Sequence, residues 1–266
     1  MRAIEIQEHL RQLNGGWLDL NNTVDTFKAG DPDAPVAGIA VGWMSYVWAL
    51  EEAVRLNCNV FVTHEPTYYD HHDNCPVMLS RPSVLAKLQR IEEHGLVIIR
   101  CHDLWDQMPG IGIPTSWGEY LGFGDPISGA GYFRVYDVSG RTAGDVAQHI
   151  AKRTAALGQD AVQLIGPGSR QVSRVAIGTG AITPFFSMVE DHHADLVICT
   201  DDGFTYWRDG AFAIDNDIPV IVVNHAVSEE AGMANLATHL QEVFPETPVH
   251  HIRQECMYRL VGALET

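Results

Sequence analysis

Histidine and carboxylate side chains directly follow three short apolar runs of this sequence. Imidazole nitrogens and carboxylate oxygens are common protein ligands of divalent metal ions. In an open α/β sheet, ligands bind just beyond the carboxyl ends of the strands, so these endings predict one metal site assembled from distant parts of the chain. The candidates are His64 and Glu65 after residues 59–63, His102 and Asp106 after residues 96–101, and His225 and Glu229 after residues 219–224.

Each ending, taken singly, also has an ordinary structural explanation. A lone histidine at a strand end, such as His64 or His102, is more often hydrogen-bonded within the fold than bound to a metal. If Ser228 caps the helix that follows, His225 lies in the preceding loop. Glu229 then lies in the first helical turn, where the helix dipole favours a carboxylate. The three endings together favour metal binding, because several charges buried at one sheet edge are costly unless a cation compensates them.

Other groups in the sequence are weaker candidates. The pairs His71–His72 and His192–His193 are readily explained as solvated side chains, and Gly178-Thr179-Gly180 lacks the third glycine of a dinucleotide-binding fingerprint. The sequence has no Gly-x-Ser-x-Gly elbow and no Walker lysine motif, and Cys101 and Cys199 lie inside apolar runs. These features argue against nucleophilic serine or cysteine catalysis.

Composition narrows the class of protein further. The 266 residues suffice for one large α/β domain or two smaller ones. A net charge of −17 without any Lys/Arg cluster argues against a nucleic-acid partner, and five cysteines without paired spacing argue against a disulfide framework. No apolar run approaches the roughly 18 to 20 residues that cross a bilayer, and the N-terminus is typical of an amphipathic helix rather than a signal peptide. The sequence therefore predicts a cytoplasmic protein with no membrane partner.

Strands and helices alternate along the chain and must position these side chains. Continuous apolar runs, rather than alternating ones, predict mainly parallel sheets covered on both faces. The predicted strands are 36–41, 59–63, 96–101, 132–138, 161–165, 172–177, 195–199, 219–223 and 248–252. The predicted helices are 3–13, 45–56, 83–94, 142–156, 185–192, 207–214 and 228–243. Residues 107–130 are rich in turn signals and are predicted as a long loop.

This pattern predicts an α/β protein of two interlocked lobes with mainly parallel central sheets. A composition shift near residue 126 places the boundary between them. The first lobe, residues 1–126, carries His64 and Asp106. The second lobe, residues 127–266, carries His225 and Glu229.

The ordered set of motifs resembles that of the Nif three-like proteins, a dinuclear-metal family also named GTP cyclohydrolase I type 2. Residues 62–66, Val-Thr-His-Glu-Pro, are similar to a His-His-Pro that follows a strand in the family. Residues 102–106 are similar to His-Thr-Asn-Leu-Asp, and residues 225–229 to a His-x-x-x-Glu that leads into a helix. Residues 175–180 look like the central strand and glycine turn. The resemblance covers nearly the whole chain, and the ordered set is specific where any one motif is not.

The resemblance implies a Nif three-like architecture and a toroidal homohexamer with its sites facing an internal cavity. It further implies that His64, Asp106, His225 and Glu229 are metal ligands and that Glu229 is able to bridge two ions. By the same resemblance, His102 is expected nearby as a supporting or substrate-facing group.

The sequence departs from the family pattern at several positions. Glu65 stands where the family has its second histidine; a carboxylate there binds harder ions such as Mn²⁺, Mg²⁺ or Fe²⁺, or else points away and leaves a single-metal site. Thr200-Asp201-Asp202 replaces a Thr-Gly-Glu turn, and the histidine expected shortly after it is missing near Trp207-Arg208. The family's N-terminal Trp-Asp-Asn-x-Gly-Leu is not recognisable in residues 17–30. These departures predict a divergent member whose substrate differs from that of its relatives.

The sequence thus predicts a metal-dependent hydrolase that uses one or two divalent ions (Zn, Mn, Fe or Mg) on a small-molecule substrate. The family name suggests a nucleotide or another phosphate or cyclic amide compound. His102 and Glu65 are the groups expected to move protons. The alternative is a non-catalytic metal-binding scaffold or regulatory ring, because a fold does not fix a function.

Overall fold

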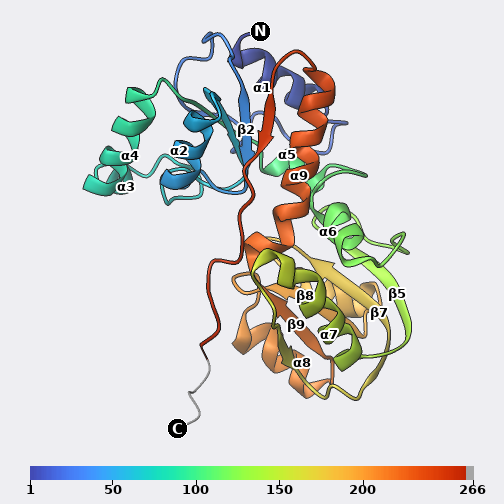
Figure 1. Ribbon diagram of the computed structural model, residues 1–266. Coiled ribbons are helices and arrows are strands. Elements are labelled where there is room, and N and C mark those ends of the chain that lie inside the picture. The colour runs from blue at the N-terminus through green and yellow to red at the C-terminus, as the bar shows by residue number, and fades with distance from the viewer. Residues whose placement is uncertain (262–266) are drawn as a thin grey trace. The chain divides into compact units, whose positions relative to one another are not determined.

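The computed structural model, which describes residues 1–261, consists of two α/β units (Figure 1). Unit 1 comprises Met1–Gly112 and Met233–Arg253, and unit 2 comprises Ile113–Gly232 and the segment that begins at Gln254. The predicted mixed α/β class with mostly parallel sheets is confirmed. The chain divides after Gly112, ahead of the expected boundary at residue 126, and residues 233–253 return to unit 1.

The sheet of unit 1 has the strand order β1-β4-β3-β2-β10. Its strands are β1 (Phe27–Ala29), β2 (Ile39–Gly42), β3 (Val60–Thr63), β4 (Val97–Arg100) and β10 (Val249–His251). Only β1 runs antiparallel to its neighbour among these described strands. Every residue of β2, β3 and β4 is buried, as expected for parallel strands covered on both faces.

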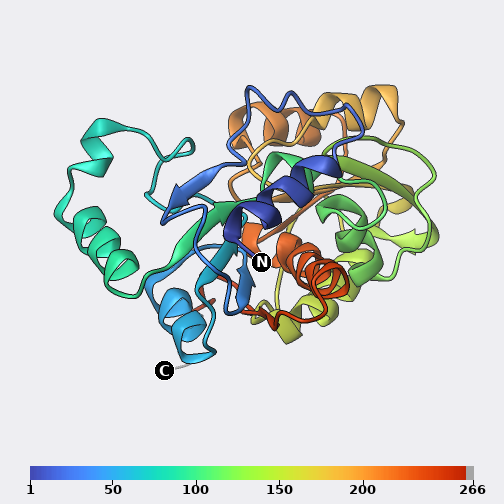
Figure 2. The same cartoon turned by 90° about the horizontal axis from the view of Figure 1, so that it is seen from above.

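Helices cover both faces of this sheet. They are α1 (Ala3–Gln12), α2 (Val47–Arg55), α3 (Pro76–Leu79), α4 (Pro82–Glu93), α5 (Asp103–Gln107) and the C-terminal part of α9 (His225–Val243). Helices α2 and α4 pack on the face that presents Phe61 and Ile98, whereas α1 and α9 lie on the opposite face (Figures 1 and 2). On that opposite face His9 and His239 approach within 2.9 Å through their Nε2 atoms. Gly95 follows α4 with a φ of +59°, the left-handed conformation that commonly ends a helix.

The sheet of unit 2 has the order β5-β7-β8-β9-β6. Its strands are β5 (Phe133–Thr142), β6 (Gln163–Ile165), β7 (Gln171–Gly178), β8 (Leu196–Thr200) and β9 (Val220–Val223). The central strands β7, β8 and β9 are parallel, and β5 and β6 add antiparallel edges. The carboxyl ends of β7, β8 and β9 therefore meet at one edge.

Two apolar layers enclose the sheet of unit 2. Its helical elements are α6 (Ile113–Leu121), α7 (Ala143–Thr154), a 3₁₀ turn (Ala155–Leu157), π-helical turns (Ser187–Asp191 and Tyr206–Gly210), α8 (Ala211–Asp215) and the first turns of α9. One layer joins the sheet to α6 and α7 and contains Trp117 and Tyr136, both fully buried. The other contains Phe185 and Met188 and includes α8 through Ala213. Thr142 and Asp145 form a capping box that starts α7, as the capped helix over 142–156 predicts.

The structure corrects two sequence predictions. The loop predicted for residues 107–130 contains α6, which buries Ile113, Trp117 and Leu121 at a helical spacing of four; Pro114 and Gly118 obscure this pattern, although proline is tolerated in a first turn. Helix α9 begins at His225 and not at 228, so Ser228 does not cap it. The Ser228 hydroxyl instead donates to the His225 carbonyl oxygen at 2.8 Å.

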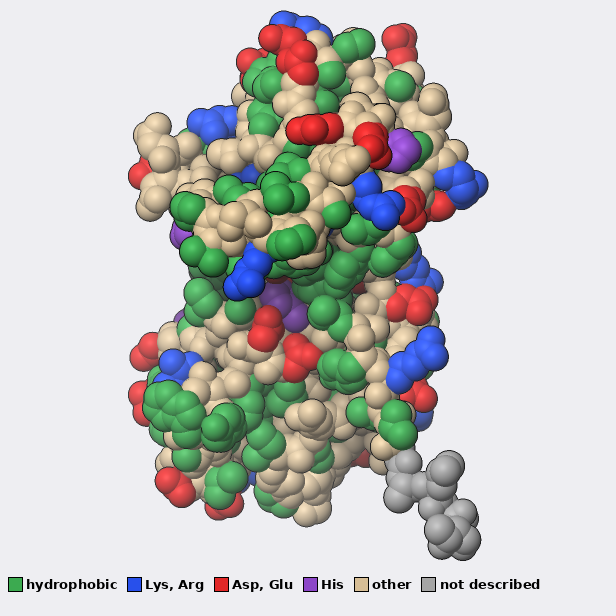
Figure 3. Space-filling model, turned by 90° about the vertical axis from the view of Figure 1, so that its left-hand side faces the viewer, with side chains coloured by type: hydrophobic (Ala, Val, Ile, Leu, Met, Phe, Trp, Pro, Cys, Tyr) green, Lys and Arg blue, Asp and Glu red, His purple; other side chains and the backbone are tan. Residues whose placement is uncertain are grey.

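Charged side chains of both signs lie interspersed on one face of the molecule (Figure 3). On the face drawn in Figure 3, Lys and Arg side chains are scattered among Asp and Glu side chains rather than gathered into one patch. None of the helices in residues 1–261 combines the length and apolar character that crossing a membrane requires.

Candidate metal centre

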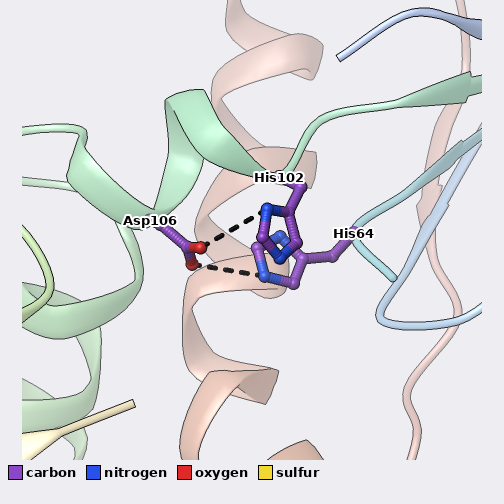
Figure 4. A group of neighbouring side chains, drawn as sticks. All are labelled: His64, His102 and Asp106. Carbon is purple, nitrogen blue, oxygen red and sulfur yellow. Dashed lines mark ion pairs between the residues drawn. The ribbon is translucent and has the colours of Figure 1, made fainter. Parts of the chain in front are cut away.

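Three predicted site residues meet at the carboxyl edge of the unit 1 sheet. His64 directly follows β3, His102 follows β4 by two residues, and Asp106 lies on α5. The Asp106 carboxylate faces both rings, with Oδ1 3.3 Å from His64 Nε2 and Oδ2 3.6 Å from His102 Nδ1 (Figure 4). The two imidazoles stack with their centroids 4.6 Å apart. We call these three residues the His64 group, and their nitrogen and oxygen ligand atoms lie within 4.8 Å of one another.

The backbone partner of His64 determines which of its ring nitrogens carries the hydrogen. His64 Nδ1 lies 3.0 Å from the Cys101 carbonyl oxygen, and because a carbonyl only accepts, Nδ1 carries the hydrogen. In the neutral ring, Nε2 then presents a lone pair toward the Asp106 carboxylate, and His64 is fully buried. A hydrogen bond from one ring nitrogen that orients the other is the usual arrangement of metal-binding histidines.

Asp25 and Asp103 hold α5 and His102 in place. Both carboxylate oxygens of Asp25, which is buried, accept hydrogen bonds from the backbone N–H groups that open α5, those of His102, Asp103 and Leu104 at 2.6, 3.1 and 2.8 Å. Asp103 in turn accepts from His102 Nδ1 at 2.8 Å and from the Thr23 hydroxyl at 2.7 Å. The start of α5 therefore depends on a carboxylate that lies far away in the sequence.

His102 is less enclosed than His64, with 17% of its side chain exposed. Burial acts to lower its pKa, but the charge of Asp106 and the hydrogen bond to Asp103 outweigh it, so the pKa of His102 lies above its ordinary value. Its ring also meets that of His71 edge-on, with centroids 5.5 Å apart. His71, which was expected to be a solvated side chain, thus lies beside the His64 group.

Glu65 is buried and lies against a cation. Its Oε2 is 3.6 Å from Nη2 of Arg100, whose side chain is fully buried at the end of β4. The Glu65 backbone N–H donates to the Trp43 carbonyl oxygen at 2.8 Å, which fixes the chain at this position. The predicted ligand Glu65 is therefore part of a buried ion pair.

The other predicted ligands form a second group in unit 2. His225 and Glu229 lie one helical turn apart at the start of α9, with His225 Nε2 3.1 Å from Glu229 Oε1. His225 Nδ1 donates to Asp202 Oδ2 at 2.9 Å, which again turns Nε2 toward a carboxylate. Burial would raise the pKa of Asp202, but the hydrogen bond and charge of His225 outweigh it, so this pKa lies below its ordinary value. We call His225 and Glu229 the His225 group.

Gly180 leaves space beside the His225 group. It lies in the turn after β7 with a φ of +72°, a conformation that L side chains rarely adopt. A Cβ atom at this position would lie 3.4 Å from Glu229 Oε1 and 3.7 Å from His225 Nε2. The glycine turn, which lacks the third glycine of a dinucleotide-binding fingerprint, thus lies against the ligand atoms of this group.

Comparison with known proteins identifies the family. The sequence model described as Duf34/NIF3 (NGG1p interacting factor 3) matches residues 24–256. The chain belongs to the NIF3 family. The resemblance stated from the motifs is therefore confirmed.

Relatives of this NIF3-family chain match along almost its whole length. A GTP cyclohydrolase 1 type 2 homolog from Chlamydia pneumoniae is 23% identical over 257 residues, which covers 92% of this chain and 95% of the relative. Protein SA1388 of Staphylococcus aureus has a similar fold, with a TM-score of 0.81 and 14% identity over 98% of this chain and 99% of that one. A Bacillus cereus protein related to NIF3 has a TM-score of 0.80 and 13% identity, covering 99% of both chains. These structures support the fold alone.

The donor atoms of the NIF3-family chain fit a divalent metal ion. Imidazole nitrogen combined with carboxylate oxygen suits Zn, Mn and Fe. Asp103 and Asp202, which orient His102 and His225, were not among the predicted site residues, although Asp202 lies in the turn that departs from the family's Thr-Gly-Glu. Cys101 and Cys199 are buried free thiols whose pKa burial raises, so neither is a nucleophile.

Proposed function

We propose that this chain binds divalent metal ions through the His64 and His225 groups and uses them to hydrolyse a small substrate. One repeated observation supports the proposal. In each group a histidine donates a hydrogen bond from Nδ1 to an oxygen, and its Nε2 faces a carboxylate, 3.3 Å away in the His64 group and 3.1 Å away in the His225 group. Two buried electron-pair donors facing each other at this distance need a cation or a proton between them. A metal ion fits this requirement. Measuring the metal content of the purified protein distinguishes a bound ion from a proton shared by the two donors.

The residues divide into donors and a proton carrier. His64, Asp106, His225 and Glu229 supply nitrogen and oxygen donors, and the family resemblance supports a bridging role for Glu229. When bound, a divalent ion supplies Lewis acidity and makes water a stronger nucleophile near neutral pH. His102 is fixed through Nδ1 to Asp103 and is partly exposed, so its Nε2 is the atom we assign to proton transfer with the substrate.

The substrate class follows from the relative's name and not from the geometry. A chain 23% identical to this one is called a GTP cyclohydrolase 1 type 2 homolog. On that basis we propose a nucleotide or another phosphate or cyclic amide compound. We also retain from the family resemblance the proposal of a homohexamer, which the mass of the purified protein in solution tests.

Replacing His64 is expected to distinguish a metal-dependent hydrolase from a non-catalytic metal-binding scaffold. Wild-type protein loaded with Mn²⁺, Zn²⁺, Fe²⁺ or Mg²⁺ is screened against phosphoesters and nucleotides, with metal content measured on the same samples. His64→Ala is expected to reduce turnover by at least about 100-fold, because a buried donor and its hydrogen bond to Cys101 are both lost. His94→Ala, an exposed histidine of the same unit, is the matched control. Bound metal without turnover on any compound would instead support the non-catalytic scaffold.

Gly180→Ala is expected to weaken metal binding at the His225 group. Its Cβ would contact Glu229 Oε1 and narrow the space around the donors, and we expect roughly tenfold weaker binding by calorimetry. Gly122→Ala is a matched control, because Gly122 has the same φ of +72° and a Cβ there would meet no atom within 4 Å. Both substitutions are expected to lower the free energy of unfolding by about 1 kcal/mol from backbone strain. Equal metal affinity in the two variants would contradict the assignment of Gly180.

A further inference from the structure

The guanidinium of Arg100 is locked in place beside the His64 group. Its Nε donates to the His64 carbonyl oxygen at 2.9 Å, and its Nη1 donates to the carbonyl oxygen of His71. These two backbone bonds leave Nη2 directed to Glu65 Oε2, 3.6 Å away. Arg100 is fully buried and Glu65 nearly so, so water screens this pair little.

In the Arg100–Glu65 pair, each side chain compensates the buried charge of the other. A buried carboxylate or guanidinium without a counter-charge is strongly unfavourable, and removing one partner of such a pair is costly. Arginine remains charged under all ordinary conditions. Glu65 therefore has a permanent cation at one of its oxygens.

Other cations hold the same stretch of chain, residues 64–73. Lys87 Nζ donates to the Thr67 carbonyl oxygen at 2.7 Å, and Lys28 Nζ donates to the His72 carbonyl oxygen at 3.5 Å and lies 4.0 Å from Asp73 Oδ2. The Asp73 carboxylate accepts the backbone N–H groups of Thr67 and Tyr68. Three cationic side chains, Arg100, Lys28 and Lys87, thus hold residues 64–73 beside the His64 group, and Glu65 and Asp73 are the carboxylates that lie against Arg100 and Lys28.

We propose that the Arg100 guanidinium supplies the positive charge at Glu65 that a second metal ion would otherwise supply. The His64 group of this chain therefore holds a single divalent ion. A neutral histidine at position 65 would offer a lone pair to a second ion, whereas Glu65 already has its cation within the protein. The inference rests on the proposed function and specifies how many ions the residues of unit 1 hold. It also makes Arg100 a positioning residue, since it acts through Glu65 and through the carbonyl oxygens of His64 and His71.

A double-mutant cycle that neutralises the two charges tests the proposal in the full-length protein. The metal-free protein is titrated with Mn²⁺ by calorimetry, and bound metal per chain is measured by mass spectrometry. Glu65→Gln leaves the guanidinium unbalanced and is expected to weaken Mn²⁺ binding roughly tenfold. Arg100→Met frees Glu65 as a ligand and is expected to tighten binding roughly tenfold and to add one ion per chain. The double variant is expected to return to within about threefold of wild type, because the two charges cancel.

Two further proteins complete the test. Arg100→Lys keeps the charge and is expected to keep the wild-type metal ratio. Arg90→Met removes an exposed arginine that pairs with Glu51 and is expected to change nothing. If Arg100→Met fails to fold, as judged by circular dichroism, comparing the double variant with Glu65→Gln still measures the effect of the guanidinium.

The possible failures are distinguishable. A double variant that binds Mn²⁺ as weakly as Glu65→Gln overturns the inference and leaves metal binding intact, because Glu65 would then act as a ligand independently of Arg100. An Arg100→Met protein with unchanged affinity and metal ratio also overturns it. A wild-type protein that takes up neither Mn²⁺ nor Zn²⁺ overturns the proposed function itself.

Discussion

Purified Asp106→Ala protein is expected to lose the metal ion of the His64 group, whose occupancy falls to less than about one-tenth of that in wild type. Asp106 places one oxygen against each of the two imidazoles of the His64 group, and only 9% of its side chain is exposed. Removing it leaves His64 Nε2 as the donor and no negative charge within the group, and a neutral donor alone compensates a divalent cation poorly. The fold is expected to survive, because Asp25 and not Asp106 holds the start of α5.

His225→Ala is the matching substitution in unit 2 and is expected to release the ion of the His225 group to a similar extent. It removes Nε2, which faces Glu229, and leaves Asp202 without the histidine that it orients. Both variants are measured by mass spectrometry of the metal after dialysis, with circular dichroism to verify folding. Asp33→Ala and His193→Ala, exposed residues of the same types, are the controls. Full metal content in both Asp106→Ala and His225→Ala would disprove the ligand assignment.

The sequence predicted the strands that carry the candidate ligands because their signal is local. β3, β4 and β9 are short apolar runs that are buried throughout, and a residue that follows such a run must lie at the carboxyl edge of the sheet. His64, His102 and Asp106 are brought together for this reason. The pairing of His225 with Glu229 was not predicted in this way, because the expected helix began at 228; α9 begins at His225 and places the two residues one turn apart.

The residues that orient the ligands were not predictable in the same way. Asp25 lies 77 residues before His102, and no local pattern connects them. The Arg100–Glu65 pair had one visible signal, an arginine inside an apolar run, which is costly unless a partner exists. The sequence alone did not indicate which carboxylate that partner would be, because the pairing depends on β3 and β4 being neighbours in the sheet. Helix α6 was missed because Pro114 and Gly118 lower helical propensity, while the buried Trp117 that stabilises it is a tertiary effect.

Lys87→Met is expected to abolish a rise of about 3 kcal/mol in the free energy of unfolding that the wild type shows between pH 8 and 10.5. Lys87 is 4% exposed, and its burial, opposed by the charge of Asp73, lowers its pKa from the ordinary 10.5 to about 8. Below pH 8 the lysine is protonated in both the folded and unfolded states, so the folded protein bears the full cost of a buried charge. Between pH 8 and 10.5 the unfolded chain binds more protons than the folded one, and the free energy of unfolding of the wild type therefore rises relative to the variant.

Urea unfolding of both proteins at pH values from 7 to 10.5 measures this difference directly. Methionine removes the buried charge but also removes the 2.7 Å hydrogen bond to the Thr67 carbonyl oxygen, which costs about 1 to 2 kcal/mol at every pH. The variant is thus expected to exceed the wild type by about 1 to 2 kcal/mol at pH 7 and to fall below it near pH 10.5. Lys152→Met, at an exposed position, controls for the general effect of removing a lysine. A difference that stays constant across this range would show that Lys87 keeps its proton equally well in both states. The charge at Lys87 would then cost the fold nothing, and residues 64–73 would be held by cations without loss of stability.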